Sequence, residues 1–131
     1  MSDARTLHDL VGPEFFVRMV DAFYDGVHTD AVLLPLYPEG EETTAARHRL
    51  AMFLVQYFGG PHDYMEQRGH PMLRARHSPY VIGERERDRW LVHMAVAIET
   101  VTSDLDAGIK DRVIEELATY MVNAAEHLRN A

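Results

Sequence analysis

Apolar residues recur at three- and four-residue intervals along most of the chain, the spacing typical of amphipathic helices. A short helix is predicted from Leu7 to about Val11, with Thr6 as its N-cap. No segment alternates apolar and polar residues as a half-buried strand would, so the pattern predicts an all-α fold. The clearest stripe belongs to a helix from Pro13 to about Val27, and its apolar positions are Phe15, Phe16, Met19, Val20, Phe23, Tyr24 and Val27.

Further segments follow the same spacing. A short segment through Leu36 leads into a turn or loop over Tyr37–Gly40. After it, one helix is predicted to end at about Phe58, another begins at about Glu84, and the last reaches Leu128. The residues expected to cap these segments are Asp30, then Thr43 or Thr44, and finally Ser103 or Asp104.

The stretch from His62 to Pro79 breaks the helical pattern. Pro71 and Gly69 interrupt it, and several arginines and histidines occur within it. We expect a long loop with at most one short helical turn. Long irregular stretches in compact domains are often functional, so this segment is a candidate for part of a site.

Composition narrows the classes of function. The 131 residues are predicted to form a single domain over 1–131, and 47% of them are apolar. The absence of cysteine excludes disulfides, thiolate ligands and iron–sulfur clusters. A formal net charge of −8 argues against nucleic-acid binding and against anionic membranes. The first ten residues lack an apolar signal core, so we expect a cytoplasmic protein.

An ordered series of motifs points to one family. Tyr57–Pro61 is YFGGP, Gln67–Pro71 is QRGHP and Leu73–Tyr80 is LRARHSPY. From about Leu7 to Leu128 the chain resembles the group II truncated haemoglobins, which are bacterial haemoglobin-like proteins. The resemblance implies a truncated globin fold, a 2-on-2 helical sandwich around haem b (iron protoporphyrin IX). Four further segments occur in the matching order: Phe23–Tyr24, Tyr37–Glu39, Met52–Leu54 and Arg87–Leu91.

His77 matches the family's proximal ligand, and the resemblance implies that it binds the haem iron. Haem iron takes a neutral imidazole nitrogen as axial ligand, while the other ring nitrogen donates to a carbonyl. A helical turn from Leu73 or Arg74 to His77 would supply such a carbonyl one turn back. On the residues alone, the alternative is a loop histidine that binds nothing.

Tyr24, Tyr37 and Trp90 match the family's polar distal set. Each side chain offers one hydrogen-bond donor, and bound O2 carries partial negative charge that such donors favour. The resemblance therefore implies that these residues hold O2 and take part in any reaction of it. Without the family pattern they would be read as ordinary core aromatics, because Tyr24 and Trp90 lie on apolar helical faces.

The resemblance also assigns the walls of the haem pocket. Ala46 matches the distal position at which many globins carry histidine or glutamine, and its methyl group leaves space for ligand access. Arg76 is expected to reach a haem propionate, because a guanidinium fork suits a carboxylate, and Tyr64 is a weaker candidate for the same task. The remaining predicted contacts of the haem are Phe23, Leu50 and Phe53.

The other charged residues are predicted to play no part in the site. The run from Glu84 to Arg89 is interpreted as the solvated start of a helix. His93 lies one turn after Trp90 and is the remaining histidine closest to the predicted site. It is interpreted, with the rest, as a surface or structural residue: His8, His28, His48, His62, His70 and His127.

Three classes of function follow from these residues. The first is tight O2 binding, with peroxidase-like or NO dioxygenase-like activity left open and a reductase as the electron donor. The second is a sensor or store of O2, CO, NO or sulfide without turnover. The third is a helical bundle without haem, with an interaction role or a His/carboxylate metal site. The family often forms homodimers, so a dimer also stays open.

Overall fold

A computed structural model describes residues 5–37 and 42–131. The predicted turn at Tyr37–Gly40 therefore lies outside the described residues beyond Tyr37. No strand occurs in the part of the chain that the structure describes, which confirms the all-α prediction. The helices are α1 (Leu7–Val11), α2 (Pro13–His28), the 3₁₀ turn η1 (Leu34–Leu36), α3 (Thr44–Tyr57), α4 (Asp63–Arg68), α5 (Leu73–His77), α6 (Glu84–Thr102) and α7 (Ala107–Leu128).

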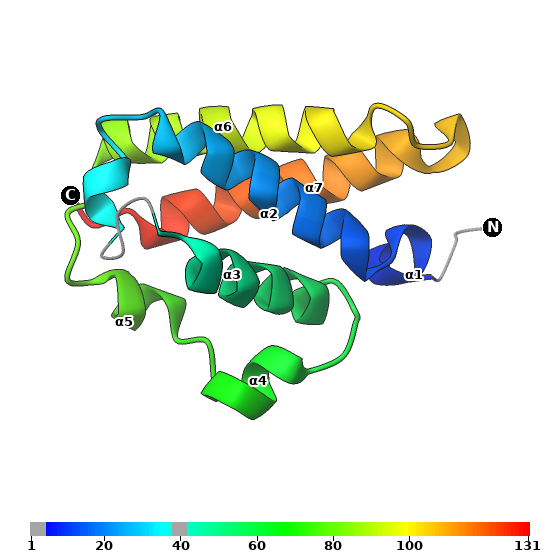
Figure 1. Ribbon diagram of the computed structural model, residues 1–131, viewed down its shortest axis with the longest axis horizontal. Helices are drawn as coiled ribbons and strands as arrows, with labels where there is room; N and C mark the ends of the chain where they lie inside the picture. The colour runs from blue at the N-terminus through cyan, green and yellow to red at the C-terminus, as the bar shows by residue number, and fades with distance from the viewer. Residues whose placement is uncertain (1–4, 38–41) are drawn as a thin grey trace.

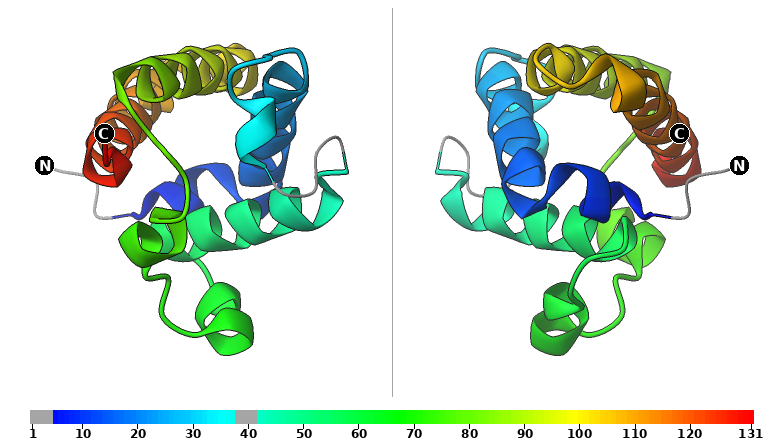
Figure 2. Two further views of the ribbon diagram at one scale, coloured as in Figure 1. Left: turned by 90° about the vertical axis from the view of Figure 1, so that its left-hand side faces the viewer. Right: turned by 90° about the vertical axis from the view of Figure 1, so that its right-hand side faces the viewer.

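The four long helices form two pairs. Helix α6 runs antiparallel to α7, and α2 packs against both α6 and α3 (Figure 1). The end-on views place α3 on the opposite side of the molecule from α6, with α4 projecting below α3 (Figure 2). None of the helices in the described residues is long and apolar enough to cross a bilayer.

Helix α2 forms the centre of the core. The apolar stripe predicted from the sequence coincides with its buried residues, and Phe16, Met19 and Phe23 are 0% exposed. Burial of such side chains contributes roughly 1.5–3 kcal/mol each. The stripe thus fixes which face of α2 meets the other helices, and it places Phe23 and Tyr24 toward the middle of the molecule.

Two predicted caps are confirmed. The Thr6 hydroxyl accepts a hydrogen bond from the Asp9 amide, and the Asp9 side chain accepts from the Thr6 amide, which completes a capping box. The Asp30 carboxylate accepts from the amides of Val32 and Leu33, at the start of the turn that leads to η1. These local contacts stabilise the chain at the start of α1 and just after α2.

Two other capping predictions differ from the structure. Thr43 occupies the N-cap position of α3, but its hydroxyl bonds to the side chains of His28 and Arg47 instead of to the helix amides. The prediction of Ser103 or Asp104 as the last cap is wrong, because Asp106 caps α7 by accepting from the Gly108 amide. The Ser103 hydroxyl donates back to α6 instead.

The irregular stretch from His62 to Pro79 contains two short helices, α4 and α5, so the prediction of at most one turn is wrong. Helix α4 ends at Gly69, whose φ of +76° suits glycine. Helix α5 follows Met72, which adopts the left-handed conformation with φ +44°. The Gln56 side chain of α3 accepts from the Met65 amide, a tertiary contact that supports α4.

The segment after α5 is held by the end of the chain. The Asn130 side chain accepts from the Ile82 amide and donates to the Tyr80 carbonyl, both at 2.8 Å. The amides of Asn130 and Ala131 donate to the Ile82 carbonyl. This clamp fixes the connection between α5 and α6, where Tyr80 and Ile82 contribute to the cavity described next.

Candidate functional site

A cavity of about 520 Å³ lies between α2, α3, α5, α6 and α7. Its volume is in the range of small-molecule and cofactor pockets. The fold brings to its walls every residue that the sequence predicts for a site: Phe23, Tyr24, Tyr37, Ala46, Leu50, Phe53, Tyr64, Arg76, His77 and Trp90. These residues come from five helices and the residue after η1, so only the folded chain assembles them.

His77 contributes an imidazole with a fixed tautomer. Its Nδ1 lies 2.7 Å from the Leu73 carbonyl, one turn back on α5. A carbonyl oxygen can only accept, so Nδ1 carries a proton, and in the neutral imidazole Nε2 is the nitrogen with the lone pair. The hydrogen bond is the one expected for a metal-binding imidazole, and its geometry follows from the short helix Leu73–His77.

Three polar aromatic side chains meet on another wall. The ring of Tyr37 lies edge-on to that of Tyr24, with 5.4 Å between centroids. Phe23 packs against both Tyr24 and Trp90, at 5.2 and 5.3 Å. The side chains of α2, α6 and the residue after η1 therefore form one contiguous cluster.

The Tyr37 hydroxyl stays protonated at any ordinary pH. Burial raises the pKa of Tyr37 far above its usual value, Tyr24 raises it further, and a hydrogen bond with Trp90 lowers it less than these raise it. The indole N–H can only donate, so the effect of Trp90 on this pKa comes from its N–H facing the Tyr37 oxygen. Tyr37 therefore keeps its own O–H for another acceptor.

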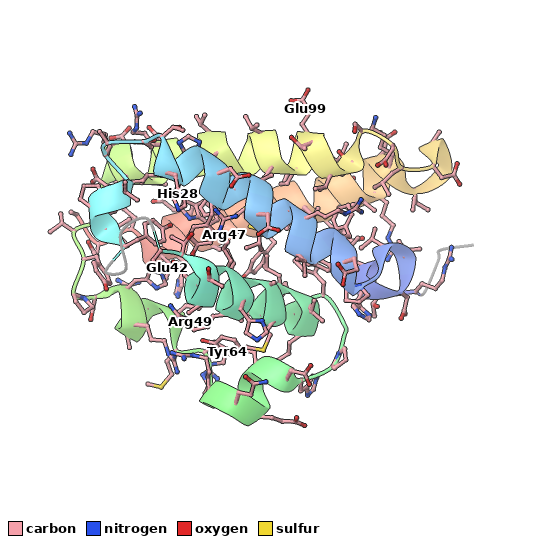
Figure 3. The ribbon with its side chains drawn as sticks, in the orientation of Figure 1. His28, Glu42, Arg47, Arg49, Tyr64 and Glu99 are labelled. Carbon is pink, nitrogen blue, oxygen red and sulfur yellow. The ribbon has the colours of Figure 1, made fainter. Side chains whose placement is uncertain are left out.

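Helix α3 forms an apolar wall. Ala46, Leu50 and Phe53 line the cavity, and the ring of buried Tyr64 packs edge-on to Phe53 at 5.5 Å. In Figure 3, Arg49 and Tyr64 lie between α3 and the α4–α5 segment. Apart from Arg49, the α3 residues on this wall are apolar, while polar groups gather around His77 and around Tyr37.

Comparisons with known proteins bear on this arrangement. The family model for bacterial-like globins matches residues 6–123. A group 2 truncated haemoglobin of Bacillus subtilis, YjbI, is 38% identical over 91% of this chain and 89% of its own length. The chain belongs to the bacterial-like globin family, among the group II truncated haemoglobins.

Solved structures agree with this assignment. The thermostable haemoglobin of Thermobifida fusca is 46% identical with a TM-score of 0.88, and the match covers 97% of this chain and 98% of that one. The truncated oxygen-avid haemoglobin of Bacillus subtilis is 33% identical with a TM-score of 0.84, covering 96% and 100%. The truncated globin fold predicted from the sequence is thereby confirmed, and membership of the globins implies haem binding.

The cavity of this truncated globin suits a haem. A haem is a flat apolar macrocycle with two carboxylates and an iron, and the cavity offers aromatic and aliphatic walls and one imidazole with a free lone pair. No group of three or more histidine, aspartate or glutamate side chains in the described residues could hold a metal without a macrocycle. The His77 imidazole and the apolar walls together fit an iron held inside haem.

Arginines surround the same cavity in an otherwise acidic globin. Arg49, Arg68, Arg76 and Arg87 all contribute to its lining. The Arg76 guanidinium donates to the Arg68 carbonyl at 3.1 Å and lies 6.0 Å from the centroid of the Tyr64 ring. Such a cluster favours the carboxylates of a ligand electrostatically.

The interpretation of Glu84–Arg89 as a solvated helix start is confirmed in part, because α6 begins at Glu84 and most of the run is exposed, but it misses contacts made by three of its residues. Glu86 and Arg87 line the cavity, and Arg87 forms an ion pair of 2.6 Å with Glu126 of α7. Arg89 forms an ion pair with buried Asp30, 59 positions away in the sequence. A helical count back from Trp90 would have placed Glu86 and Arg87 one turn before it, on the same side of α6.

Asp30 is the only carboxylate classed as buried among the described residues. Its side chain is 1% exposed, and it accepts from Arg89 Nε at 2.9 Å and from His93 Nε2 at 2.7 Å. Burial alone raises the pKa of Asp30, but the hydrogen bonds from His93, Arg89 and the amides of Val32 and Leu33 hold it well below its ordinary value. The structural interpretation of His93 agrees with this contact.

The low pKa of Asp30 predicts a pH-dependent contribution to stability. Because the folded-state pKa lies below that of the unfolded chain, the carboxylate stabilises the fold above about pH 4, and this stabilisation is lost as the pH falls further. We expect Asp30→Asn to lower the free energy of unfolding by about 3 kcal/mol at neutral pH, with a difference that shrinks below about pH 4. Urea unfolding across this pH range measures it.

Asp88→Asn is the control for this measurement, because the Asp88 side chain is 58% exposed. It should change the free energy of unfolding little at any pH. An Asp30→Asn effect that is the same at pH 7 and at pH 3 would contradict a stabilising charge at this position.

A second hollow, of about 540 Å³, lies on the outer side of α2 and α3. Figure 3 labels His28, Glu42 and Arg47 at this junction. Arg47 forms ion pairs with Asp21 and Asp25, and His28 bonds to Thr43. These polar groups form ion pairs and hydrogen bonds with one another across the contact between α2 and α3. The hollow is therefore better described as part of this helix contact than as a binding site.

Proposed function

We propose that this truncated haemoglobin binds haem b through Nε2 of His77 and uses it to bind O2 tightly. The hydrogen bond from His77 Nδ1 to the Leu73 carbonyl carries the proposal, because it leaves a basic nitrogen beside a cavity that fits a haem. When bound, haem supplies an iron that takes diatomic ligands reversibly. The name of the relative from Bacillus subtilis, which describes it as oxygen-avid, supports the choice of O2.

Tyr24, Tyr37 and Trp90 would retain the ligand. O2 in a ferrous haem protein carries partial negative charge, and the O–H and N–H groups of these side chains are suitable donors to it. A hydrogen bond to a charged acceptor contributes roughly 1.5–3 kcal/mol, and about 1.4 kcal/mol corresponds to a tenfold change in an equilibrium constant. The Trp90 bond to Tyr37 holds the Tyr37 ring so that its own proton is available to the ligand.

Arg76 and the neighbouring arginines would bind the propionates. Their guanidinium groups surround the cavity, and Arg76 is oriented by the Arg68 carbonyl and the Tyr64 ring. Phe23, Leu50 and Phe53 would contact the macrocycle, and Ala46 would leave room for a ligand to enter.

The polar cluster favours reaction of the ligand over transport of it. Slow release suits a carrier poorly, whereas donors fixed beside a developing negative charge assist peroxide or NO chemistry. Repeated NO turnover would need electrons from a reductase, whereas peroxide turnover would take them from a reducing substrate. A gas sensor or store without turnover is the alternative that the assay below distinguishes.

The test uses the haem-loaded, reduced protein. We expect a reversible spectral change on exposure to O2 and its reversal on removal of O2, and we expect peroxide to be consumed with an aromatic reductant. The triple variant Tyr24→Phe, Tyr37→Phe, Trp90→Phe should load haem but lose most peroxide turnover. Reversible O2 binding without any turnover would favour the sensor or store, and immediate oxidation without reversible binding would contradict the proposal.

A further inference from the structure

Asp30, Arg89 and His93 join the turn after α2 to α6, and we call them the Asp30 latch. Asp30 lies just after α2, and its carboxylate accepts hydrogen bonds from Arg89 and His93 of α6 at 2.7–2.9 Å. None of the three side chains lines the cavity. The cavity therefore does not account for the buried Asp30 carboxylate or for its hydrogen bonds with Arg89 and His93.

One side of the latch leads directly to Tyr37. The Asp30 carboxylate accepts from the amides of Val32 and Leu33. The Asp30 backbone carbonyl accepts from the Leu34 amide at 3.0 Å. The Leu34 carbonyl in turn accepts from the Tyr37 amide at 3.1 Å. The Asp30 backbone is thus connected through Leu34 to the backbone of Tyr37, and the Asp30 carboxylate holds the same turn at Val32 and Leu33.

The other side of the latch holds the helix that carries Trp90. Arg89 is the residue before Trp90, and His93 lies one turn after it. The His93 ring also packs against Gly26 of α2 so closely that an added Cβ would lie 2.5 Å from Nδ1. Gly26 is two residues from Tyr24, so the same ring fixes α6 against the helix that carries the third polar aromatic.

We propose that Asp30 is a positioning residue that sets the aim of Tyr37 and Trp90 toward the ligand. It acts through the backbone from Asp30 to Tyr37 and through the register of α6, and it does not touch the ligand. An asparagine at this position would offer one acceptor oxygen and would turn N–H donors toward Arg89 or His93. The resulting shift would separate the Trp90 indole from the Tyr37 oxygen. This inference rests on the proposed function.

The first readout is O2 dissociation. We expect Asp30→Asn and Arg89→Ala to speed dissociation about three- to tenfold, because misaligned donors bind O2 more weakly. Arg89 is half exposed, so its replacement gives a folded variant if Asp30→Asn is unstable. In a Tyr37→Phe background neither substitution should speed O2 dissociation much further. This is the result that a double-mutant cycle gives when the first residue acts through the second. Glu116→Gln, which removes an ion pair with Arg112 on α7, is the control and should leave the rate unchanged.

The second readout does not depend on ligand chemistry. Trp90 is the only tryptophan, so the protein has a single indole N–H resonance in its NMR spectrum. We expect Asp30→Asn and Arg89→Ala to shift this resonance in the haem-loaded, CO-bound protein, while Glu116→Gln leaves it in place. Should the chain fail to load haem, the proposed function fails, and the same resonance still tests the latch in the full chain without haem.

The outcomes are separable. An accelerated rate that depends on Tyr37, together with a shifted indole resonance, supports the latch as a positioning device. Unchanged rates and an unchanged resonance, with only a lower melting temperature, would overturn it in favour of a structural role. Full additivity with Tyr37→Phe would also overturn it, because Asp30 would then act on the rate by another route.

Discussion

Tyr37→Phe is expected to accelerate O2 dissociation by about tenfold to a hundredfold. The change removes one O–H donor that lies in the polar cluster and is held by Trp90, while the ring and its contact with Tyr24 remain. A hydrogen bond of roughly 1.5–3 kcal/mol corresponds to about that factor. Stopped-flow mixing of the oxygenated protein with an O2 scavenger measures the rate.

Tyr57→Phe is the matched control for this loss of a hydroxyl. Tyr57 is 55% exposed and does not line the cavity. Its replacement should leave the dissociation rate within about twofold of the parent. Equal rates for the parent and Tyr37→Phe would remove Tyr37 from the ligand-binding set and return it to the core aromatics.

His77→Gly is expected to weaken haem binding by about a hundredfold or more. Loss of groups that merely orient a metal ligand costs about 10- to 100-fold in affinity, and here the ligand itself is removed. The arginines and the apolar walls would still hold some haem. Transfer of haem to an excess of a haem-free scavenger globin, followed by absorbance, gives the rate of loss.

His62→Gly provides the control in the same irregular segment. His62 is exposed and occupies the N-cap of α4, where its side chain makes no capping bond and glycine is tolerated. Haem should leave this variant no faster than it leaves the parent. Equally slow loss from His77→Gly would show that another residue holds the iron.

Local sequence signals determined most of the helices. The apolar stripe of α2 and the Thr6–Asp9 capping box depend on residues three and four apart, so they can be read directly from the chain. Helix α4 could not be, because its six residues are supported by Gln56 and by the packing of Tyr64 on Phe53. Such tertiary support outweighs local propensity in short helices.

The sequence predicted which residues line the cavity, but it did not predict the hydrogen bonds that hold some of them in place. The family motifs supplied the residues on the cavity wall, and the Leu73–His77 turn supplied the imidazole hydrogen bond. The Asp30 latch joins residues about sixty positions apart, and no spacing rule links them. Apart from the resemblance, the chain shows only an acidic helical domain with histidines, which is why the roles of Tyr24 and Trp90 needed the family pattern.

The central claim is that the His77 imidazole binds the haem iron, and the ferrous spectrum of His77→Gly with and without added imidazole tests it most directly. We predict that the parent shows the spectrum and the iron–imidazole vibration of a five-coordinate haem with a histidine ligand. His77→Gly should lose both, and free imidazole should restore them by filling the space that the side chain left. If His77→Gly keeps the parent spectrum and vibration without imidazole, the claim is contradicted.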